Sequence, residues 1–169
     1  NLATDDWKTL HSFGGIPARH YDMALVFVDT LVRHLIATGD KDFAREMWPY
    51  LTRHLAWEKR LFDRGGLYEA YAAIWASDAL TYNGGGAAHA TAYNFFHNTQ
   101  AARIARLIGE DPAPYEAEAK RIHEAMQREL WLEDRGWYAE YKELHGLKRP
   151  HPAAALWTVY HTIDSRVPD

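Results

Sequence analysis

The sequence contains no cysteine, and this absence narrows its chemistry. Without thiols the chain forms no disulfide, offers no thiolate nucleophile and builds no cysteine metal site. Histidine remains as a metal ligand, but His89 and His97 are eight residues apart on one expected helix. That spacing corresponds to a rise of about 12 Å, too far for one ion without further ligands. We therefore expect no metal site.

Long hydrophobic runs and a basic stripe are also lacking. No stretch of about 18 uncharged apolar residues occurs, and the polar start at Asn1 has no signal-peptide pattern, so we expect no membrane anchor. The formal charge of −4 comes from acids and bases scattered along the chain, which predicts no nucleic-acid partner. The compartment stays open between cytoplasm, periplasm and exterior.

What is present fits one soluble globular domain. The chain has 169 residues and a hydrophobic fraction of 47%, enough for a sizeable core. It begins with Asn1 and stops at Pro168-Asp169, just after an apolar run. We therefore expect residues 1–169 to be a partial domain of something longer.

Apolar periodicity predicts five helices of two alternating kinds. Residues 18–36, 87–108 and 153–163 are apolar almost all round, which is typical of helices buried on most sides. Residues 41–62 and 112–132 carry one apolar stripe and a charged back. Inner and outer helices therefore alternate, and helical hairpins that cannot bury their faces alone must stack on neighbours. The predicted fold class is all-α, a segment of an α/α toroid.

A coarse repeat supports this hairpin arrangement. Two glycines and two tyrosines of the first half recur seventy positions later, separated in each half by an outer helix. The residues are Gly39, Gly66, Tyr68 and Tyr71, then Gly109, Gly136, Tyr138 and Tyr141.

The connections differ in length, and this difference locates the expected site. Tight turns follow the first and third helices. Long links follow the second and fourth helices, and together with the lead-in at 1–17 they fall at the other end of the stack. One short strand is expected at 137–141. Function in repeat scaffolds tends to lie on the face with the long loops.

One of these connections combines acids with aromatic residues. Glu69 and Asp78 stand among aromatic side chains, and carboxylates framed by flat faces suit a sugar ring. Glycoside cleavage requires one carboxylic acid to protonate the leaving oxygen and a second carboxylate to activate water or attack carbon. Asp78 is the first candidate for the proton donor, because Trp75 and Tyr82 would desolvate it and raise its pKa.

Other residues at the same end are candidates for substrate binding. Several of the acidic candidates also fit a purely structural role. Asp78 also suits a helix cap, Glu69 a structural bond to loop amides, and Glu140 a solvated strand edge. The glycines at 84–86 fit a close approach of the backbone to substrate or to Trp75 better than a phosphate loop. The substrate-binding candidates are Trp7, His11, Tyr71, Trp75, Tyr82, Asn83, His89, Glu140, Tyr141 and His151.

Three stretches resemble the six-hairpin glycosidases, whose catalytic domain is an (α/α)6 toroid. They are GLYEAYAAIWASDALTYNGGG at 66–86, TGD followed by FAREMWP at 38–49, and RGWYAEYK at 135–142. The similarity is closest to the group of glycogen-debranching-like, α-L-rhamnosidase-like and related bacterial enzymes. It covers nearly the whole chain, but only half or less of such a domain.

The resemblance implies hydrolysis of a glycosidic bond in an oligosaccharide or glycan, usually with inversion and without an organic cofactor. It places the general acid at Asp78, with Glu69 as substitute, and commonly takes the partner base from a later hairpin. The remaining hairpins of the toroid are then the expected partner. Two other functions stay open: a sugar epimerase in which His89 faces His151 or His161, and a carbohydrate-binding module without chemistry.

Overall fold

The computed structural model describes residues 21–69 and 85–168, and helices make up most of this part of the chain. None of the described helices is both long and apolar enough to cross a membrane. The links between the helices contain paired strands of two residues each, more than the single strand expected. The elements are α2 (Tyr21–Thr38), α3 (Lys41–Phe62), β1 (Asp63–Arg64), β2 (Leu67–Tyr68), β3 (Gly86–Ala87), α4 (Ala88–Ile108), α5 (Ala113–Glu129), β4 (Trp131–Leu132), β5 (Trp137–Tyr138), β6 (Tyr141–Lys142), β7 (Pro150–His151) and α6 (Leu156–Asp164).

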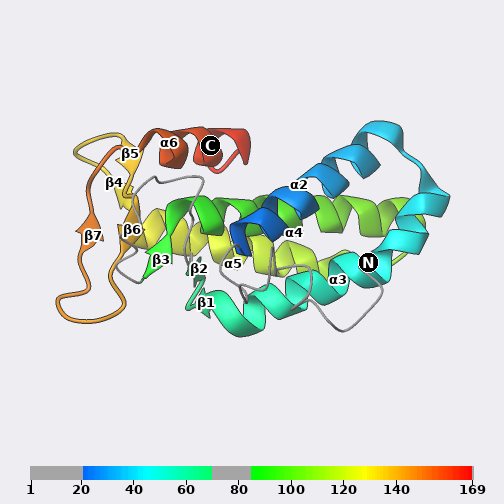
Figure 1. Ribbon diagram of the computed structural model, residues 1–169, viewed down its shortest axis with the longest axis horizontal. Coiled ribbons are helices and arrows are strands. Elements are labelled where there is room, and N and C mark those ends of the chain that lie inside the picture. The colour runs from blue at the N-terminus through cyan, green and yellow to red at the C-terminus, as the bar shows by residue number, and fades with distance from the viewer. Residues whose placement is uncertain (1–20, 70–84, 169) are drawn as a thin grey trace, which may run out of the picture.

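The helices form an inner and an outer layer, as the alternation of apolar and amphipathic segments predicts. The central helix α4 packs against α2 and α6 of the inner layer and against α3 and α5 of the outer layer. Figure 1 shows α2 and α6 along one side of α4 and α3 along the opposite side. Because it has neighbours on every side, α4 is buried along most of its length.

Local capping chemistry sets the helix ends. Asp40 caps α3 by accepting hydrogen bonds from the backbone N–H groups of Asp42 and Phe43, at 3.1 and 3.0 Å. The Asp111 side chain accepts from the N–H of Ala113 at the start of α5. Gly109 ends α4 in the left-handed conformation, with φ 88°, which glycine adopts without a steric penalty. These tight turns are the ones expected from the sequence.

The seventy-residue repeat corresponds to a repeated structural unit. Each outer helix, α3 and α5, runs into a two-stranded antiparallel hairpin, β1–β2 after the first and β4–β5 after the second. Gly66 and Gly136 occupy the hairpin turns with positive φ, and Tyr68 and Tyr138 are buried in the returning strands. Gly66, Tyr68, Gly136 and Tyr138 therefore shape the links at the long-loop end, whereas Gly39 and Gly109 end the inner helices at the tight turns.

The expectation that α2 is buried on most sides is wrong. Leu25, Val32 and Leu35 are fully buried, but Phe27 on the opposite side is 49% exposed. Among the described helices, α2 packs chiefly against α4, and it meets α6 through the ion pair of Arg33 with Asp164. An apolar surface on nearly every side of a helix therefore does not predict that every side is buried.

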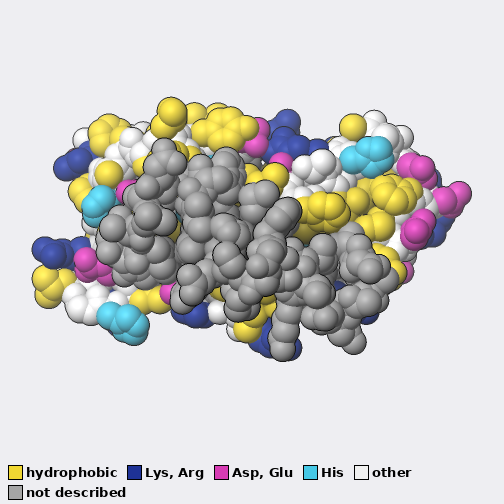
Figure 2. All heavy atoms as spheres, in the orientation of Figure 1, with side chains coloured by type: hydrophobic (Ala, Val, Ile, Leu, Met, Phe, Trp, Pro, Cys, Tyr) yellow, Lys and Arg dark blue, Asp and Glu magenta, His cyan; other side chains and the backbone are white. Residues whose placement is uncertain are grey.

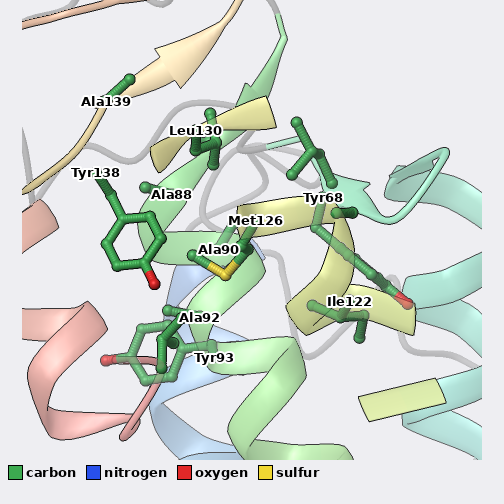
Figure 3. Close-up of a cluster of buried hydrophobic side chains, with 14 of the residues drawn as sticks. Tyr68, Ala88, Ala90, Ala92, Tyr93, Ile122, Met126, Leu130, Tyr138 and Ala139 are labelled. Atoms are coloured by element: carbon green, nitrogen blue, oxygen red, sulfur yellow. The ribbon is translucent and has the colours of Figure 1, made fainter. Parts of the chain in front are cut away.

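Small side chains on α4 allow the layers to approach closely. Ala88, Ala90 and Ala92 are almost completely buried in the larger core cluster, together with Ile122 and Met126 of α5. Figure 3 shows these side chains, with the tyrosines of both hairpins at the edges of the cluster. A second cluster joins α2, α3 and the C-terminal half of α4. The first cluster fixes the long-loop end relative to the helices, and the second holds the helices to one another.

Candidate functional site

The first hairpin positions Glu69. Arg64 pairs with Leu67 across a two-residue turn of Gly65 and Gly66, which both have positive φ (78° and 105°). In two-residue hairpin turns this conformation matches the right-handed twist of the flanking strands. A Cβ on Gly66 would lie 2.5 Å from Cβ of Ala125, so the turn can sit against α5 only as glycine.

Glu69 follows this hairpin directly and is held at both backbone and side chain. Its N–H donates to the carbonyl of Phe62 at 2.9 Å, and its backbone forms a bridge with Gly86. Its carboxylate forms an ion pair with Nη2 of Arg64 at 2.7 Å, and the side chain is 16% exposed. Within the described residues, the carboxylate of Glu69 therefore has a side-chain cation as its partner.

Strand β3 lies at the meeting point of the two long connections. Gly86 and Ala87 pair antiparallel with Lys142 and Tyr141, and β6 pairs in turn with β7. Two glycines make this close packing possible: a Cβ on Gly85 would lie 1.9 Å from the carbonyl oxygen of Lys142, and one on Gly86 would lie 2.4 Å from Cβ of Leu67. The close approach expected of the glycine run is thus made to the chain's own residues.

The second connection brings together the three candidates Glu140, Tyr141 and His151. The carbonyl of Glu140 accepts from the N–H of Ala88 at 2.9 Å, and the N–H of Glu140 donates to the carbonyl of His151 at 3.0 Å. Oε2 of Glu140 lies 3.2 Å from Nδ1 of His151. The rings of Tyr141 and His151 stack with centroids 4.8 Å apart and planes 8° from parallel. An oriented imidazole and an acid therefore share a half-exposed sheet edge.

A cleft of about 260 Å³ opens between the two connections. The buried residues Leu67 and Gly86 line it together with charged residues from both connections. Arg64 is paired with Glu69, and Lys142 is paired with Glu129 of α5. This mixture of apolar and charged lining suits a small polar ligand with a carbon skeleton. The lining is Arg64, Gly65, Leu67, Gly86, Glu129, Lys142, Glu143, Leu144 and Lys148.

His89 lies away from this sheet edge, between α4 and α6. Its ring is 6% exposed, and its centroid is 6.2 Å from that of His161. Burial, reinforced by the neighbouring His161, lowers the pKa of His89 to about 3. The remaining candidates fall outside the described residues: Trp7, His11, Tyr71, Trp75, Asp78, Tyr82 and Asn83.

Sequence reasoning missed a buried polar pair on α3. His54 and Glu58 are both 0% exposed, with Nε2 and Oε1 3.5 Å apart. The signal was available, because Leu51, His54, Leu55 and Glu58 stand at positions i, i+3, i+4 and i+7, the spacing of a helix face that packs on a neighbour. Burial raises the pKa of Glu58 well above its ordinary value, against a hydrogen bond with Asn94.

A second missed group joins α3, α5 and β2. Glu118 accepts from the Tyr68 hydroxyl at 3.1 Å, from Nζ of Lys59 at 2.6 Å and from Nε of Arg121 at 3.0 Å. Arg121 continues to Asp63 at the start of the first hairpin. Within residues 21–69 and 85–168, no three histidine, aspartate or glutamate side chains converge closely enough to hold a metal ion.

The comparisons with known proteins identify the fold. No protein-family model and no curated protein matches the sequence. Among solved structures, the GH78-family rhamnosidase of Bacillus sp. GL1 matches with a TM-score of 0.73 and 17% identity over 89% of this chain. A rhamnosidase from Klebsiella oxytoca with rhamnose bound matches with a TM-score of 0.64 and 23% identity, again over 89%. The chain spans only 16% and 28% of the lengths of these proteins. It has the fold of part of an α/α toroid, as expected.

Proposed function

We propose that this chain is part of a glycoside hydrolase whose acid and base are carboxyl groups at the long-loop end. One observation carries the proposal: the connections that bear Glu69 and Glu140 converge on the same short strand, β3. The backbones of two acidic residues from separate hairpins thereby lie beside one strand at one end of the helical stack. The similarity of the fold to two rhamnosidases is in keeping with this function.

The mechanism we propose uses Asp78 as general acid and Glu69 as the second carboxylate or its substitute. The acid would protonate the leaving glycosidic oxygen, and the base would activate water on the opposite face of the sugar, which inverts the configuration. In the proposed enzyme the base comes from Glu69 or from a later hairpin. The substrate class is an oligosaccharide or glycan, and the similar proteins make a rhamnoside the first to test.

The described residues fit supporting roles in this reaction. Glu140 and the paired Glu69 can accept hydrogen bonds from sugar hydroxyls, since a carboxylate offers two acceptor oxygens. The stacked rings of Tyr141 and His151 present a flat surface to the C–H face of a sugar. The adjoining cleft of about 260 Å³ can take part of a carbohydrate. The candidates Trp75, Tyr71, Tyr82, Asn83, Trp7 and His11 are assigned to the same end.

The epimerase alternative receives little support from the histidines. An acid/base pair needs one protonated and one neutral partner at working pH. His89 and His161 are close to each other, but burial lowers the pKa of both, so both are neutral near pH 7. His151, on β7, is paired with Glu140 and not with His89. The third alternative, a binding module without chemistry, predicts binding of sugar without turnover.

The test compares Asp78→Asn and Glu69→Gln with the wild type in the full-length protein. We expect each substitution to reduce release of a chromogenic phenol from an aryl rhamnoside by about 10²–10⁴-fold. Binding of rhamnose, measured by calorimetry, should persist. Asp134→Asn, on the exposed turn of the second hairpin, is the matched control and should leave turnover unchanged. Unaltered turnover in Asp78→Asn would remove Asp78 from the mechanism, and loss confined to a His89/His161 double variant would favour the epimerase.

A further inference from the structure

A groove of about 200 Å³ lies between the outer helices α3 and α5, and it shares no lining residue with the cleft at the long-loop end. The surface of α3 around it is charged: Figure 2 shows lysine and arginine side chains along the lower edge of the molecule, where Figure 1 places α3. In the groove itself, the charged groups among the described residues are Lys59 and Glu118. The groove is therefore less charged than the helix surface beside it.

Two contacts between α3 and α5 hold this outer groove in shape. The rings of Trp48 and Tyr115 meet edge to face, with centroids 5.3 Å apart and planes at 70°. Nζ of Lys59 lies 2.6 Å from Oε2 of Glu118. Trp48 and Lys59 are separated by three turns of α3, about 16 Å, and the lining residue Ala56 lies between them. The groove is thus formed before any ligand arrives.

The inner wall of the groove contains a buried amide that is only half satisfied. Asn98 of α4 is 4% exposed and lines the groove. Its Nδ2 donates to the backbone carbonyl of Asn94 at 2.8 Å, but no group in the described part of the chain donates to its Oδ1. Because buried polar atoms in proteins almost always have a hydrogen-bond partner, this oxygen offers an acceptor to a bound molecule.

The other groove residues define what such a molecule must carry. Lys59 has three N–H donors and uses one on Glu118, so it can donate to a ligand oxygen. The hydroxyl of Thr52 donates to the carbonyl of Pro49 at 3.2 Å, so its oxygen can accept. The charges of Lys59 and Glu118 cancel each other, which favours a neutral ligand. A hydroxyl group both donates and accepts, and it meets these requirements without a charge.

We propose that the outer groove binds a small neutral polyhydroxylated molecule, a single sugar ring or a polyol. One ligand hydroxyl donates to Oδ1 of Asn98, a second accepts from Nζ of Lys59, and the C–H face packs on the half-buried ring of Tyr115. A volume of about 200 Å³ lies below the range of about 300–1,000 Å³ for drug-sized ligands, so one ring fits but a chain does not. None of the acids assigned to hydrolysis lines this groove, so the inference does not rest on the proposed function.

The test fills the groove from its exposed rim in the full-length protein. Ala56 is exposed and lines the groove, so Ala56→Trp places an indole where the ligand would lie. Glucose, rhamnose and glycerol are the probes, and ligand-observed NMR measures their binding. We expect Ala56→Trp to weaken the saturable binding of at least one probe by about 10-fold or more, because the groove has no room for both. Leu61→Trp is the control: Leu61 is 42% exposed on α3 outside the groove, and its variant should bind as the wild type does.

A second variant tests the acceptor. Asn98→Ala should weaken binding of the same probe by about 5-fold, the loss of one hydrogen bond. Equal binding by Ala56→Trp and the wild type would overturn the proposal, and so would a wild type that binds none of the three probes or binds acetate or phosphate in their place. Turnover of an aryl rhamnoside should be the same in Ala56→Trp and the wild type. Binding that Ala56→Trp removes would support the outer groove even in a protein without glycoside turnover, so the two proposals fail separately.

Discussion

At the scale of single residues, Glu58 couples the stability of the helical stack to pH. Its carboxyl group is fully buried between α3 and α4, and burial raises its pKa far above the ordinary value. In the unfolded chain the same carboxyl has an ordinary pKa of about 4.3. Between these two values the folded chain binds one proton more than the unfolded chain. The stability that the protonated Glu58 contributes is therefore complete below pH 4.3 and is lost as the pH rises toward the pKa of Glu58 in the folded chain.

Glu58→Gln should remove this dependence. A glutamine has nearly the same shape and never ionises, so we expect the variant to exceed the wild type in free energy of unfolding by about 1–3 kcal/mol at pH 7 and to gain little at pH 4.5. Urea denaturation at both pH values measures the difference. Glu124→Gln, on the exposed side of α5, is the control and should shift neither value. An equal effect at pH 4.5 and pH 7 would contradict the assignment.

At the scale of elements, strand β3 depends on glycine at its entrance. Gly85 has φ 137°, and a Cβ there would overlap the carbonyl oxygen of Lys142 at 1.9 Å. We expect Gly85→Ala to cost about 3 kcal/mol or more in free energy of unfolding, because the pairing of β3 with β6 must break. Gly146→Ala is the matched control: its φ of 65° carries a penalty of about 1–2 kcal/mol, but nothing lies within 4 Å. Thermal denaturation of both variants tests the prediction, and equal losses would refute the role of close packing.

Several elements could be predicted from the sequence because their causes are local. Asp40 caps α3, the side chain of Asp111 accepts from the first N–H of α5, and Gly39 and Gly109 adopt positive φ where the helices end. The alternation of uncharged and amphipathic helices, together with the long links, placed Glu69 and Glu140 at one end, and β3 joins their connections. Whether either acid takes part in catalysis stays a prediction.

The features that the sequence did not predict depend on contacts distant along the chain. Strands of two residues carry no period-2 signal, so β3, β6 and β7 are defined only by one another. His54 is fully buried on α3, which its polar residue type does not predict. The uncharged stretch of α6 likewise does not reveal which of its faces the chain covers.

At the scale of the whole molecule, α4 unites the helices while Glu118 ties the outer layer together. Helix α3 contributes Lys59, α5 contributes Arg121 and β2 contributes the Tyr68 hydroxyl, all within hydrogen-bonding distance of one carboxylate. Burial alone would raise the pKa of Glu118, but hydrogen bonds from Arg121 and Lys59 outweigh it and lower the pKa. The charge of Glu118 thus holds separate helices and the first hairpin in register.

This arrangement predicts the acid limit of the fold. A carboxyl with a lowered folded pKa stabilises the protein fully above its unfolded pKa, and the stabilisation is lost as the pH falls through the folded value. Glu118→Gln should therefore lower the free energy of unfolding by about 1–3 kcal/mol at pH 7, because two cations lose a charged acceptor. As the pH falls through the lowered pKa of Glu118, the stabilities of the variant and the wild type should converge. Glu110→Gln, in the exposed turn before α5, is the control. Urea denaturation from pH 7 down to pH 3 measures both, and a constant difference over this range would show that the charge of Glu118 is not what joins α3 to α5.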